Sequence, residues 1–396
     1  MKKILGFSKP VFVLGVVSLL TDLSSEMIYP ILPLFLANVI GASTTFIGLI
    51  EGIAESTASL LKVFSGWLSD KLNKRRQLIL SGYGLSSVVK PFLALATSGW
   101  HVLGLRFADR LGKGIRGAPR DALIADATEP SERGKAFGFH RAMDTVGAIL
   151  GPAATFMILP FFDHTYRPLF LIAAIPALAA VAVIIFSVKD MPRISNEAVK
   201  NIQGSKKFDA SFIILLGIIA IFTLGNSSDA FLILRAQNVG IKPLHIPILW
   251  LFFNLIYTVV SVPAGKLSDI IGRKRIIFTG FIVYSACYAG FAFASEWWHA
   301  WALFGIYGIY YGTTEGVIKA YISDIVSAEV RATSFGIYNF VTGIILFPAN
   351  LLTGWIWKAY GATYAFGLGA VLACIAASAF ALFSIIHKRS KLAPQF

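Results

Sequence analysis

Long apolar stretches recur along this chain, separated by short polar segments. The stretches Leu169–Ile185, Phe212–Ser228 and Thr363–Ile386 contain no charged residue. A helix that crosses the hydrocarbon core of a bilayer, about 30 Å thick, needs roughly 20 apolar residues because it rises about 1.5 Å per residue. Backbone groups in hydrocarbon find no water to bond, so such segments are expected to be helical. The pattern predicts an all-α polytopic membrane protein.

The number of these segments predicts two halves of similar size. The segment 189–208 is polar and basic and contains Pro192 and Gly204, which interrupt regular structure. We therefore expect two six-helix bundles, residues 1–188 and 209–396, joined by a linker at 189–208. The twelve expected spans cover residues 10–37, 43–68, 77–97, 101–127, 135–160, 167–187, 209–237, 245–268, 275–295, 298–326, 332–358 and 363–387.

Composition and charge agree with a membrane protein and predict its orientation. Hydrophobic residues make up 56% of the chain and charged residues 14%, whereas a soluble domain carries about 25% charged residues. The net charge of +14 comes largely from Lys and Arg in alternate connections, such as Lys71–Arg76 and Arg273–Arg275. The turns at 38–45, 97–101 and 295–299 contain neither. The positive-inside rule then predicts cytoplasmic termini, and it explains the charge without a nucleic-acid partner.

A repeated pattern relates the two expected halves. The segment Gly66–Arg76 returns as Gly265–Arg275, 199 residues later, and Asp121–Gly138 returns as Lys319–Gly336, 198 residues later. Two separate matches at nearly the same spacing indicate an internal repeat. Because each copy contains six spans, an even number, both copies have the same orientation, related by an axis along the membrane normal.

The first repeated segment resembles a loop motif of the major facilitator superfamily, G-x-x-x-D-[RK]-x-G-[RK]-[RK], with Asn73 in place of the second glycine. The segment Arg110–Ala118 resembles the family motif R-x-x-Q-G-x-G-A-A, with Lys113 in place of glutamine. The resemblance implies a solute transporter in which the loops act as a conformational latch, although their basic residues also set topology. The candidate latch residues are Gly66, Asp70, Arg75, Gly265, Asp269 and Arg273.

Two shorter motifs are similar to those of exporter branches of this superfamily. Gly147-x-x-x-Gly151-Pro152, in the fifth expected span, resembles the Gly-Pro motif of antiporters, although the glycines that usually follow are absent. Tyr29-Pro30-Ile-Leu-Pro33, in the first span, resembles a Pro-x-x-Pro element of drug exporters. This similarity implies efflux, and it does not identify a substrate.

Charged residues inside the spans are the candidates for chemistry, because a charge in hydrocarbon is costly and normally faces a cavity or a partner. Asp22 and Glu26 are four residues apart in the first span, and so are Glu51 and Glu55 in the second. Residues at this spacing share one helix face. The fourth span carries a basic stripe of Arg106, Arg110 and Lys113, and Arg116 and Arg120 continue the positive run.

Counting from the outer helix ends places Glu26 and Arg110 at depths that differ by about 3 Å. Our hypothesis is that Asp22 or Glu26 carries a proton and that Arg110 modulates it. A nearby guanidinium favours the ionised carboxylate, whereas desolvation favours the protonated one, and alternating access could move the group between these surroundings. A static ion-pair network that packs the helices is the alternative.

Further polar side chains are candidates for a substrate cavity between the halves. His140 and Asp144 could form a proton relay or a structural pair, and two such residues are too few for a metal site. Glu315 and Lys319 could bind substrate or simply pair along their helix. The candidates are Tyr29, His140, Asp144, Asn226, Asp229, Tyr311, Glu315, Lys319 and Asn339.

The motifs of several other functional classes are missing from the sequence. It contains no H-E-x-x-H, G-x-S-x-G or G-x-x-x-x-G-K-[ST] segment, which argues against an intramembrane enzyme and an ATP-driven pump. We expect a secondary transporter with no catalytic residue, metal or cofactor, driven by the proton motive force. Proton-coupled efflux by a monomer in a bacterial cytoplasmic membrane is the favoured function. A proton- or sodium-coupled importer or uniporter, or an exporter of a polar metabolite or siderophore, is the alternative. A channel is an alternative of another class, but it would not need two repeated latch loops.

Overall fold

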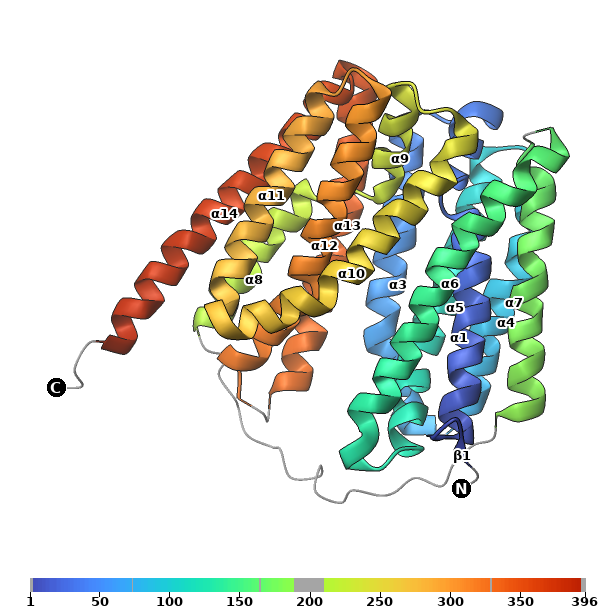
Figure 1. The fold of residues 1–396 in the computed structure, drawn as a ribbon, viewed down its shortest axis with the longest axis horizontal. Helices are drawn as coiled ribbons and strands as arrows, with labels where there is room; N and C mark the ends of the chain where they lie inside the picture. Colours follow the sequence, from blue (N-terminus) through green and yellow to red (C-terminus); the bar gives the residue numbers. More distant parts are fainter. Residues whose placement is uncertain (1–2, 73, 164, 189–209, 328–329, 393–396) are drawn as a thin grey trace. The chain divides into compact units, whose positions relative to one another are not determined.

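The computed structural model describes residues 3–72, 74–163, 165–188, 210–327 and 330–392, and these are almost entirely helical (Figure 1). The expected linker at 189–208 lies outside the described residues. The chain folds into two compact units. The first unit contains Met1–Glu197 and Lys242–Leu251, and the second contains Ala198–Ile241 and Phe252–Phe396.

Long helices lie at all twelve positions where the apolar pattern predicts them. In the first unit they are α1 (Lys9–Ile28), the short α2 (Leu32–Leu34) and η1 (Phe35–Val39), α3 (Thr44–Leu72), α4 (Arg75–Phe92), α5 (Gly99–Asp126), α6 (Arg133–Ile158) and α7 (Arg167–Ser187). The later ones are α8 (Ala210–Gly225), α9 (Asp229–Asn238), α10 (Ile246–Ile271), α11 (Arg273–Phe293), α12 (Trp297–Ile325), α13 (Arg331–Tyr360) and α14 (Ala362–Leu392).

A small hairpin at the start corrects the expectation of a purely helical chain. Strand β1 (Lys3–Ile4) pairs antiparallel with β2 (Phe7–Ser8). The turn between them places Leu5 and Gly6 at positive φ. The hairpin is too short for the apolar pattern to reveal, and it directly precedes α1.

Two of the expected spans are interrupted, which the apolar pattern did not predict. The first span leaves regular α-helix at Tyr29–Ile31, where Pro30 and Pro33 each lack a backbone N–H. The seventh breaks between α8 and α9, at 226–228. There the Ser228 N–H donates to the Asn350 side-chain oxygen at 2.6 Å, and the Ser228 hydroxyl caps α9. Polar side chains thus satisfy backbone groups that the break exposes.

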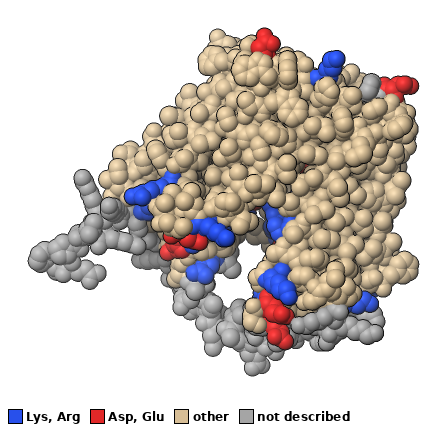
Figure 2. Space-filling view, in the orientation of Figure 1, with Lys and Arg blue, Asp and Glu red and all other residues tan. Residues whose placement is uncertain are grey.

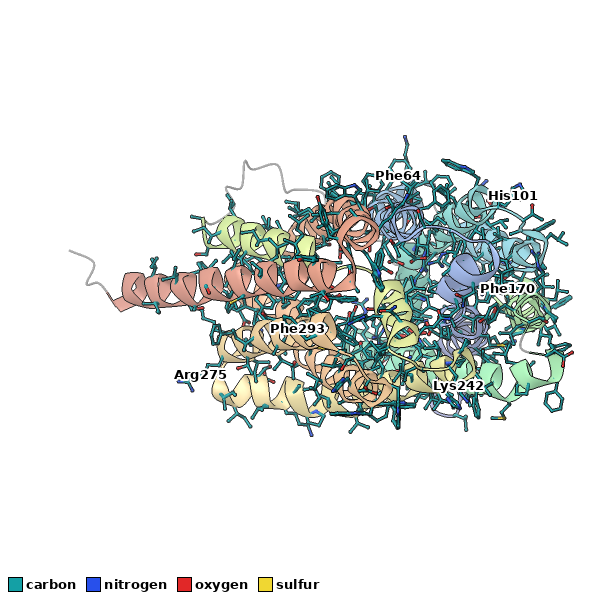
Figure 3. All side chains as sticks on the ribbon, turned by 90° about the horizontal axis from the view of Figure 1, so that it is seen from above. Phe64, His101, Phe170, Lys242, Arg275 and Phe293 are labelled. Atoms are coloured by element: carbon teal, nitrogen blue, oxygen red, sulfur yellow. The ribbon has the colours of Figure 1, made fainter. Side chains whose placement is uncertain are left out.

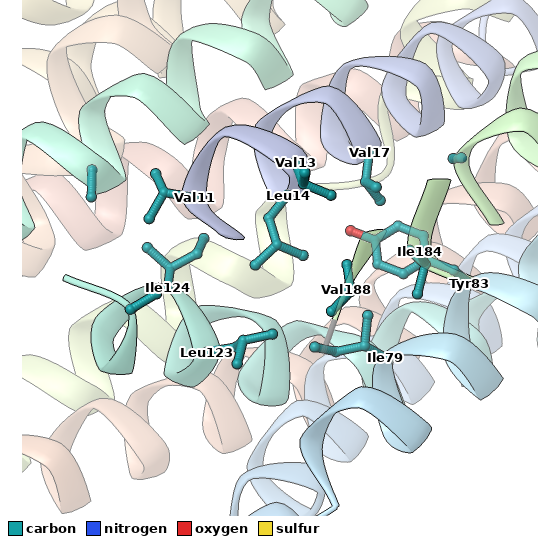
Figure 4. Packing of buried hydrophobic residues seen from close by; sticks show 13 residues of the cluster. Val11, Val13, Leu14, Val17, Ile79, Tyr83, Leu123, Ile124, Ile184 and Val188 are labelled. Atoms are coloured by element: carbon teal, nitrogen blue, oxygen red, sulfur yellow. The ribbon is translucent and has the colours of Figure 1, made fainter. Parts of the chain in front are cut away.

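The first unit has an apolar core between α1, α4, α5 and α7. Val11, Leu14, Ile79, Ile124 and Ile184 are each at most 1% exposed in this cluster (Figure 4). The second unit is held largely by aromatic side chains. The Phe222 and Phe281 rings stack with centroids 4.1 Å apart, and the Tyr284 and Tyr288 rings with centroids 4.2 Å apart.

The outer surface of the helices is suited to lipid. Nine helical segments in the described part of the chain are long and apolar enough to cross a membrane. Large apolar side chains are exposed on these helices, such as Phe293 of α11, and Phe64 is exposed on α3; charged residues are sparse on the face that Figure 2 shows (Figures 2 and 3). The helices α3, α5 and α12 are of similar length but carry more charged residues, among them Glu51, Arg110 and Glu315.

Candidate functional site

Two ion pairs join α3 to α5 in the first unit. Nη2 of Arg106 lies 2.9 Å from both carboxylate oxygens of Glu51, and Nη2 of Arg110 lies 2.8 Å from Oε1 of Glu55. The repeat of four residues in both helices places the two pairs one turn apart, like the rungs of a ladder. The pair of Glu51 and Arg106 is more enclosed than the pair of Glu55 and Arg110, because the Glu51 side chain is 2% exposed and the Glu55 side chain is 32% exposed. Arg110 therefore has Glu55 as its ion-pair partner.

The next two cations on α5 have different surroundings. Arg116 is buried, donates to the Ser86 hydroxyl at 2.8 Å, and lies over the Tyr83 ring at 4.2 Å. Lys113 is exposed although it lies near the middle of α5, and it forms no hydrogen bond or ion pair with the residues that the structure describes. The basic residues of this span therefore differ in their partners. Arg106 and Arg110 pair with glutamates, Arg116 contacts a hydroxyl group and an aromatic ring, and Lys113 has no partner among the described residues.

The two acids of α1 have no guanidinium within ion-pair distance among the described residues. Glu26 accepts a hydrogen bond of 2.8 Å from the Trp250 indole, which belongs to the same unit, and the Trp250 ring lies 5.0 Å from that of Tyr29. Asp22 forms no hydrogen bond or ion pair within the described ranges. These acids therefore differ from Glu51 and Glu55, which are held by arginines.

Glycines of α6 bring its backbone against these acids. A Cβ placed on Gly147 would lie 2.9 Å from Cβ of Asp22, and one placed on Gly151 would lie 2.7 Å from Cβ of Glu26. Real Cβ atoms do not approach so closely, so only glycine allows this packing. The Gly147-x-x-x-Gly151 motif therefore positions the two acids through close helix contact.

Substitution of Gly151 by alanine is expected to impair both stability and transport. The added methyl group must push α6 away from α1, and overpacking of this kind costs about 1–3 kcal/mol. Thermal unfolding of the purified protein and the transport rate would both report the change. Gly138 lies on the same helix with open space around its Cβ position, so Gly138→Ala is the control and should behave like the wild type. Equal behaviour of the two variants would contradict the positioning role.

Lys90 of α4 is not among the candidates predicted from the sequence. This lysine is 4% exposed, and its ammonium group donates to the Ser24 hydroxyl at 2.7 Å and to the Ser25 hydroxyl at 3.0 Å. A signal was present, because Lys90 is the only charged residue of the expected span 77–97. A charge within such a span is a functional candidate by default. The Lys90 ammonium group therefore lies against α1, the helix that carries Asp22 and Glu26.

His140 and Asp144 form a pair on α6. Nδ1 of His140 lies 3.5 Å from Oδ2 of Asp144, and the Ser18 hydroxyl of α1 donates to the same carboxylate. Nowhere in the described ranges do three His, Cys, Asp or Glu side chains gather as metal ligands would. The pair links α6 to α1 near the acids.

The candidates of the second unit surround a group of aromatic rings. The Tyr307 hydroxyl donates to Asp229 at 2.6 Å, and the Tyr284 hydroxyl lies 3.2 Å from Oδ1 of Asn226. Asp229 and Asn226 flank the break between α8 and α9. Tyr311 packs edge-on against Tyr307, with ring centroids 5.1 Å apart.

Glu315 and Lys319 pair along α12 at 3.1 Å, as their spacing predicts, and the Tyr257 hydroxyl also donates to Glu315 at 2.6 Å. Asn339 is half-buried on α13. The polar groups of this unit are therefore held mainly by phenol hydroxyls rather than by arginines.

Comparison with known proteins identifies the family of this chain. The sequence model of the Major Facilitator Superfamily matches residues 14–234 and 210–395. The chain belongs to the major facilitator superfamily. An uncharacterized MFS-type transporter of Methanocaldococcus jannaschii is 39% identical over 374 residues, which cover 93% of each chain. The protein is therefore an integral membrane protein of a transporter family and not an enzyme.

Two further comparisons concern more distant members of the superfamily. The tetracycline resistance protein, class B, of Escherichia coli is 26% identical over 310 residues, which cover 72% of each chain. The structure of a bacterial homolog of the human lysosomal transporter Spinster has a TM-score of 0.74 and 16% identity, and the match covers 95% of this chain and 96% of that one. This likeness shows a shared fold.

The superfamily loop motif forms the same contacts in both units. Arg75 contacts the Asp126 carboxylate and donates to the Ala122 carbonyl at 3.2 Å. Arg273 lies 2.5 Å from Asp324 and donates to the Ala320 carbonyl at 2.5 Å. All three residues of the second set stand 198 positions after those of the first. The repeat found in the sequence therefore extends to side-chain contacts.

The other motif residues differ between the two copies. Asp269 lies 3.5 Å from Arg273, whereas the side chain of Asp70 lies outside the described residues. A Cβ on Gly66 would meet Cβ of Ala118 at 3.5 Å, an ordinary contact, and a Cβ on Gly265 would have open space. In this superfamily member Arg75 and Arg273 therefore bind the ends of α5 and α12. The helix packing leaves room for a larger side chain at Gly66 and Gly265.

Breaking the Arg75 contact is expected to slow the conformational cycle without weakening substrate binding. A partly buried ion pair has two discrete states and can bias a switch. We expect Arg75→Gln to lower the maximal transport rate about tenfold, with the half-saturating concentration unchanged. Asp126→Asn should have the same effect, and the double variant should add nothing because the two residues form one contact. Additive losses, or a normal rate in Arg75→Gln, would contradict the latch role.

Proposed function

We propose that this protein is a proton-coupled exporter that exchanges protons for a small solute by alternating access. The observation that carries this proposal is the contrast between two sets of acids in the first unit. Glu51 and Glu55 are bound by arginines, so a proton taken up by either would break an ion pair. Glu26 has a neutral indole partner, and Asp22 has no direct partner in the described part of the chain. The second set can therefore take up a proton without the loss of an ion pair.

The placement of these acids supports coupling. Both lie on α1, beside the interruption at Tyr29–Ile31, and both pack on glycines of α6. Broken helices in transporters commonly mark the site where ions and substrates bind. A small shift of α6 against α1 would change the surroundings of both acids together, as a coupled exchange requires. The likeness to a tetracycline resistance protein favours export over import.

The same proposal includes the finer architecture. Twelve membrane spans form two pseudo-symmetric six-helix bundles, residues 1–188 and 209–396, with a cytoplasmic linker at 189–208 and both termini in the cytoplasm. The protein works as a monomer in the cytoplasmic membrane and needs no cofactor besides the proton motive force. The alternation of basic and neutral connections supports this orientation.

Everted membrane vesicles with an acidic interior provide the test. A panel of lipophilic cations, amino acids, organic acids and siderophores would be added while a dye reports the pH gradient. Proton exchange predicts that one class of solute dissipates the gradient in vesicles that contain the protein and not in vesicles that lack it. Solute movement that follows a sodium gradient and ignores the pH gradient would overturn proton coupling. Solute uptake only in right-side-out vesicles would overturn export.

A further inference from the structure

Lys113 is an exception among the cations of α5. Three buried arginines of this helix, Arg106, Arg110 and Arg116, each have a partner, which is Glu51, Glu55 or the pair of Ser86 and Tyr83. The fourth arginine, Arg120, pairs with Asp121. Lys113 lies on the same stripe and shows no hydrogen bond or ion pair with the described residues. It is also exposed, whereas the three arginines are buried.

An unpaired ammonium group in the middle of a membrane helix requires water or a counter-ion. A lysine in hydrocarbon at the helix centre costs about 2.5–3.5 kcal/mol on insertion scales. Residues of this kind therefore line water-filled paths or meet charged partners. The position of Lys113, 14 residues into a helix of 28 residues, is too deep for its side chain to reach the headgroups.

An acid of α1 lies within electrostatic range of Lys113. Asp22 interacts electrostatically with Lys113, yet the two form no ion pair, so their charged atoms are more than 4.0 Å apart. Of the other acids in electrostatic range of Lys113, Glu55 is bound by Arg110 and Glu26 by Trp250. Asp22 is also in electrostatic range of Arg116, Arg120 and Asp144, and Asp144 is bound by Ser18 and His140. Asp22 and Lys113 are thus two opposite charges that share one region and lack direct partners in the described part of the chain.

We propose that Lys113 and Asp22 form the two ends of a binding site for a zwitterionic solute. Lys113 binds the anionic group of the solute, and the Asp22 carboxylate receives its ammonium group. A solute with a single charge would satisfy one end and leave the other uncompensated. Because the two groups interact electrostatically but form no ion pair, a ligand with both charges can bridge them.

This inference rests on the proposed function and gives it a chemical basis for exchange. An ammonium group at Asp22 stabilises the ionised carboxylate and so displaces its proton. Solute and proton then compete for Asp22, which is the condition for antiport. A solute with only an anionic group would instead favour the protonated acid, and its binding would draw a proton in with it.

Two matched sets of probes test the charge requirement. Leucine and leucyl-leucine are zwitterions, their amides are cations, and their N-acetyl derivatives are anions. Binding to the purified protein in nanodiscs is measured without a proton gradient, and exchange is measured in proteoliposomes by counterflow. We expect the zwitterion of at least one set to bind at least about tenfold more tightly than its singly charged analogues, because removal of one charge partner is costly.

Variants of Lys113 provide the decisive comparison. Lys113→Gln should abolish the preference for the zwitterion, leaving the amide bound as well as the parent compound, and Lys113→Arg should retain the preference. Lys358→Gln removes an exposed lysine at the end of α13 and should match the wild type. An unchanged preference in Lys113→Gln overturns the proposal, as does a wild type that binds no zwitterion of either set.

The outcomes separate this site from the proposed function. Zwitterion binding that depends on Lys113, together with counterflow that ignores a pH gradient, supports the site and overturns proton exchange. Proton exchange with solutes that lack an anionic group overturns the site and leaves the proposed function standing.

Discussion

Replacing both acids of α1, with Asp22→Asn and Glu26→Gln, is expected to abolish proton-driven uphill transport. Neither amide can take up and release a proton, so the driving gradient would no longer be linked to solute movement. The substitutions keep the size of both side chains, and the Trp250 indole can still donate to the amide oxygen at position 26. Loss of at least about 100-fold in uphill transport is expected, by analogy with the loss of an essential proton-transfer group. Everted vesicles with an imposed pH gradient provide the measurement.

Downhill movement of the solute distinguishes loss of coupling from loss of fold. If the double variant still carries solute down its own gradient, the protein is folded and only the link to protons is gone. Glu129→Gln combined with Asp163→Asn neutralises two acids in connections between helices, and this control should transport normally. Uphill transport at the wild-type level in the Asp22/Glu26 variant would show that the α1 acids are structural.

The sequence predicts the helices of this protein well because hydrocarbon imposes a simple pattern. Apolar length and composition locate nine of the helical segments in the described part of the chain, and α7 has the expected limits of 167–187. Interruptions within helices are harder to predict because they depend on distant residues. The break before Ser228 is stabilised by Asn350, which is 122 positions away in the chain, and no local signal reveals that contact.

Charged residues within spans are visible in a sequence, whereas their partners are not. Depth counting placed Arg110 level with Glu26, yet Arg110 pairs with Glu55. Depth gives the position along a helix axis and not the direction in which a side chain points. The helices α3 and α5 pair through matching four-residue spacings, which a comparison of their patterns could have suggested. Trp250 beside Glu26 is a contact across 224 positions, beyond any local pattern.

The second large effect is expected at the buried pair of Glu51 and Arg106. Replacing Glu51 with glutamine leaves the Arg106 guanidinium buried without its ion-pair partner. Removal of one member of a buried ion pair costs about 3–5 kcal/mol because the remaining charge is uncompensated. Glu55 and Asp109 are in electrostatic range of Arg106 but form no ion pair with it in the described part of the chain, and its Nε finds no hydrogen-bond partner there. Thermal unfolding in detergent and the yield of folded protein would measure the loss.

The neighbouring pair supplies a matched control within the same two helices. Glu55→Gln removes the same chemical group one turn away, but Glu55 is 32% exposed, so water can compensate Arg110 and the loss should be about 1 kcal/mol. In the double variant Glu51→Gln/Arg106→Gln no charge is left unpaired, and most of the stability should return. If Glu51→Gln is as stable as Glu55→Gln, burial does not govern these pairs. If the double variant is no more stable than Glu51→Gln alone, the loss arises from packing, and the ladder joins α3 to α5 by shape rather than by charge.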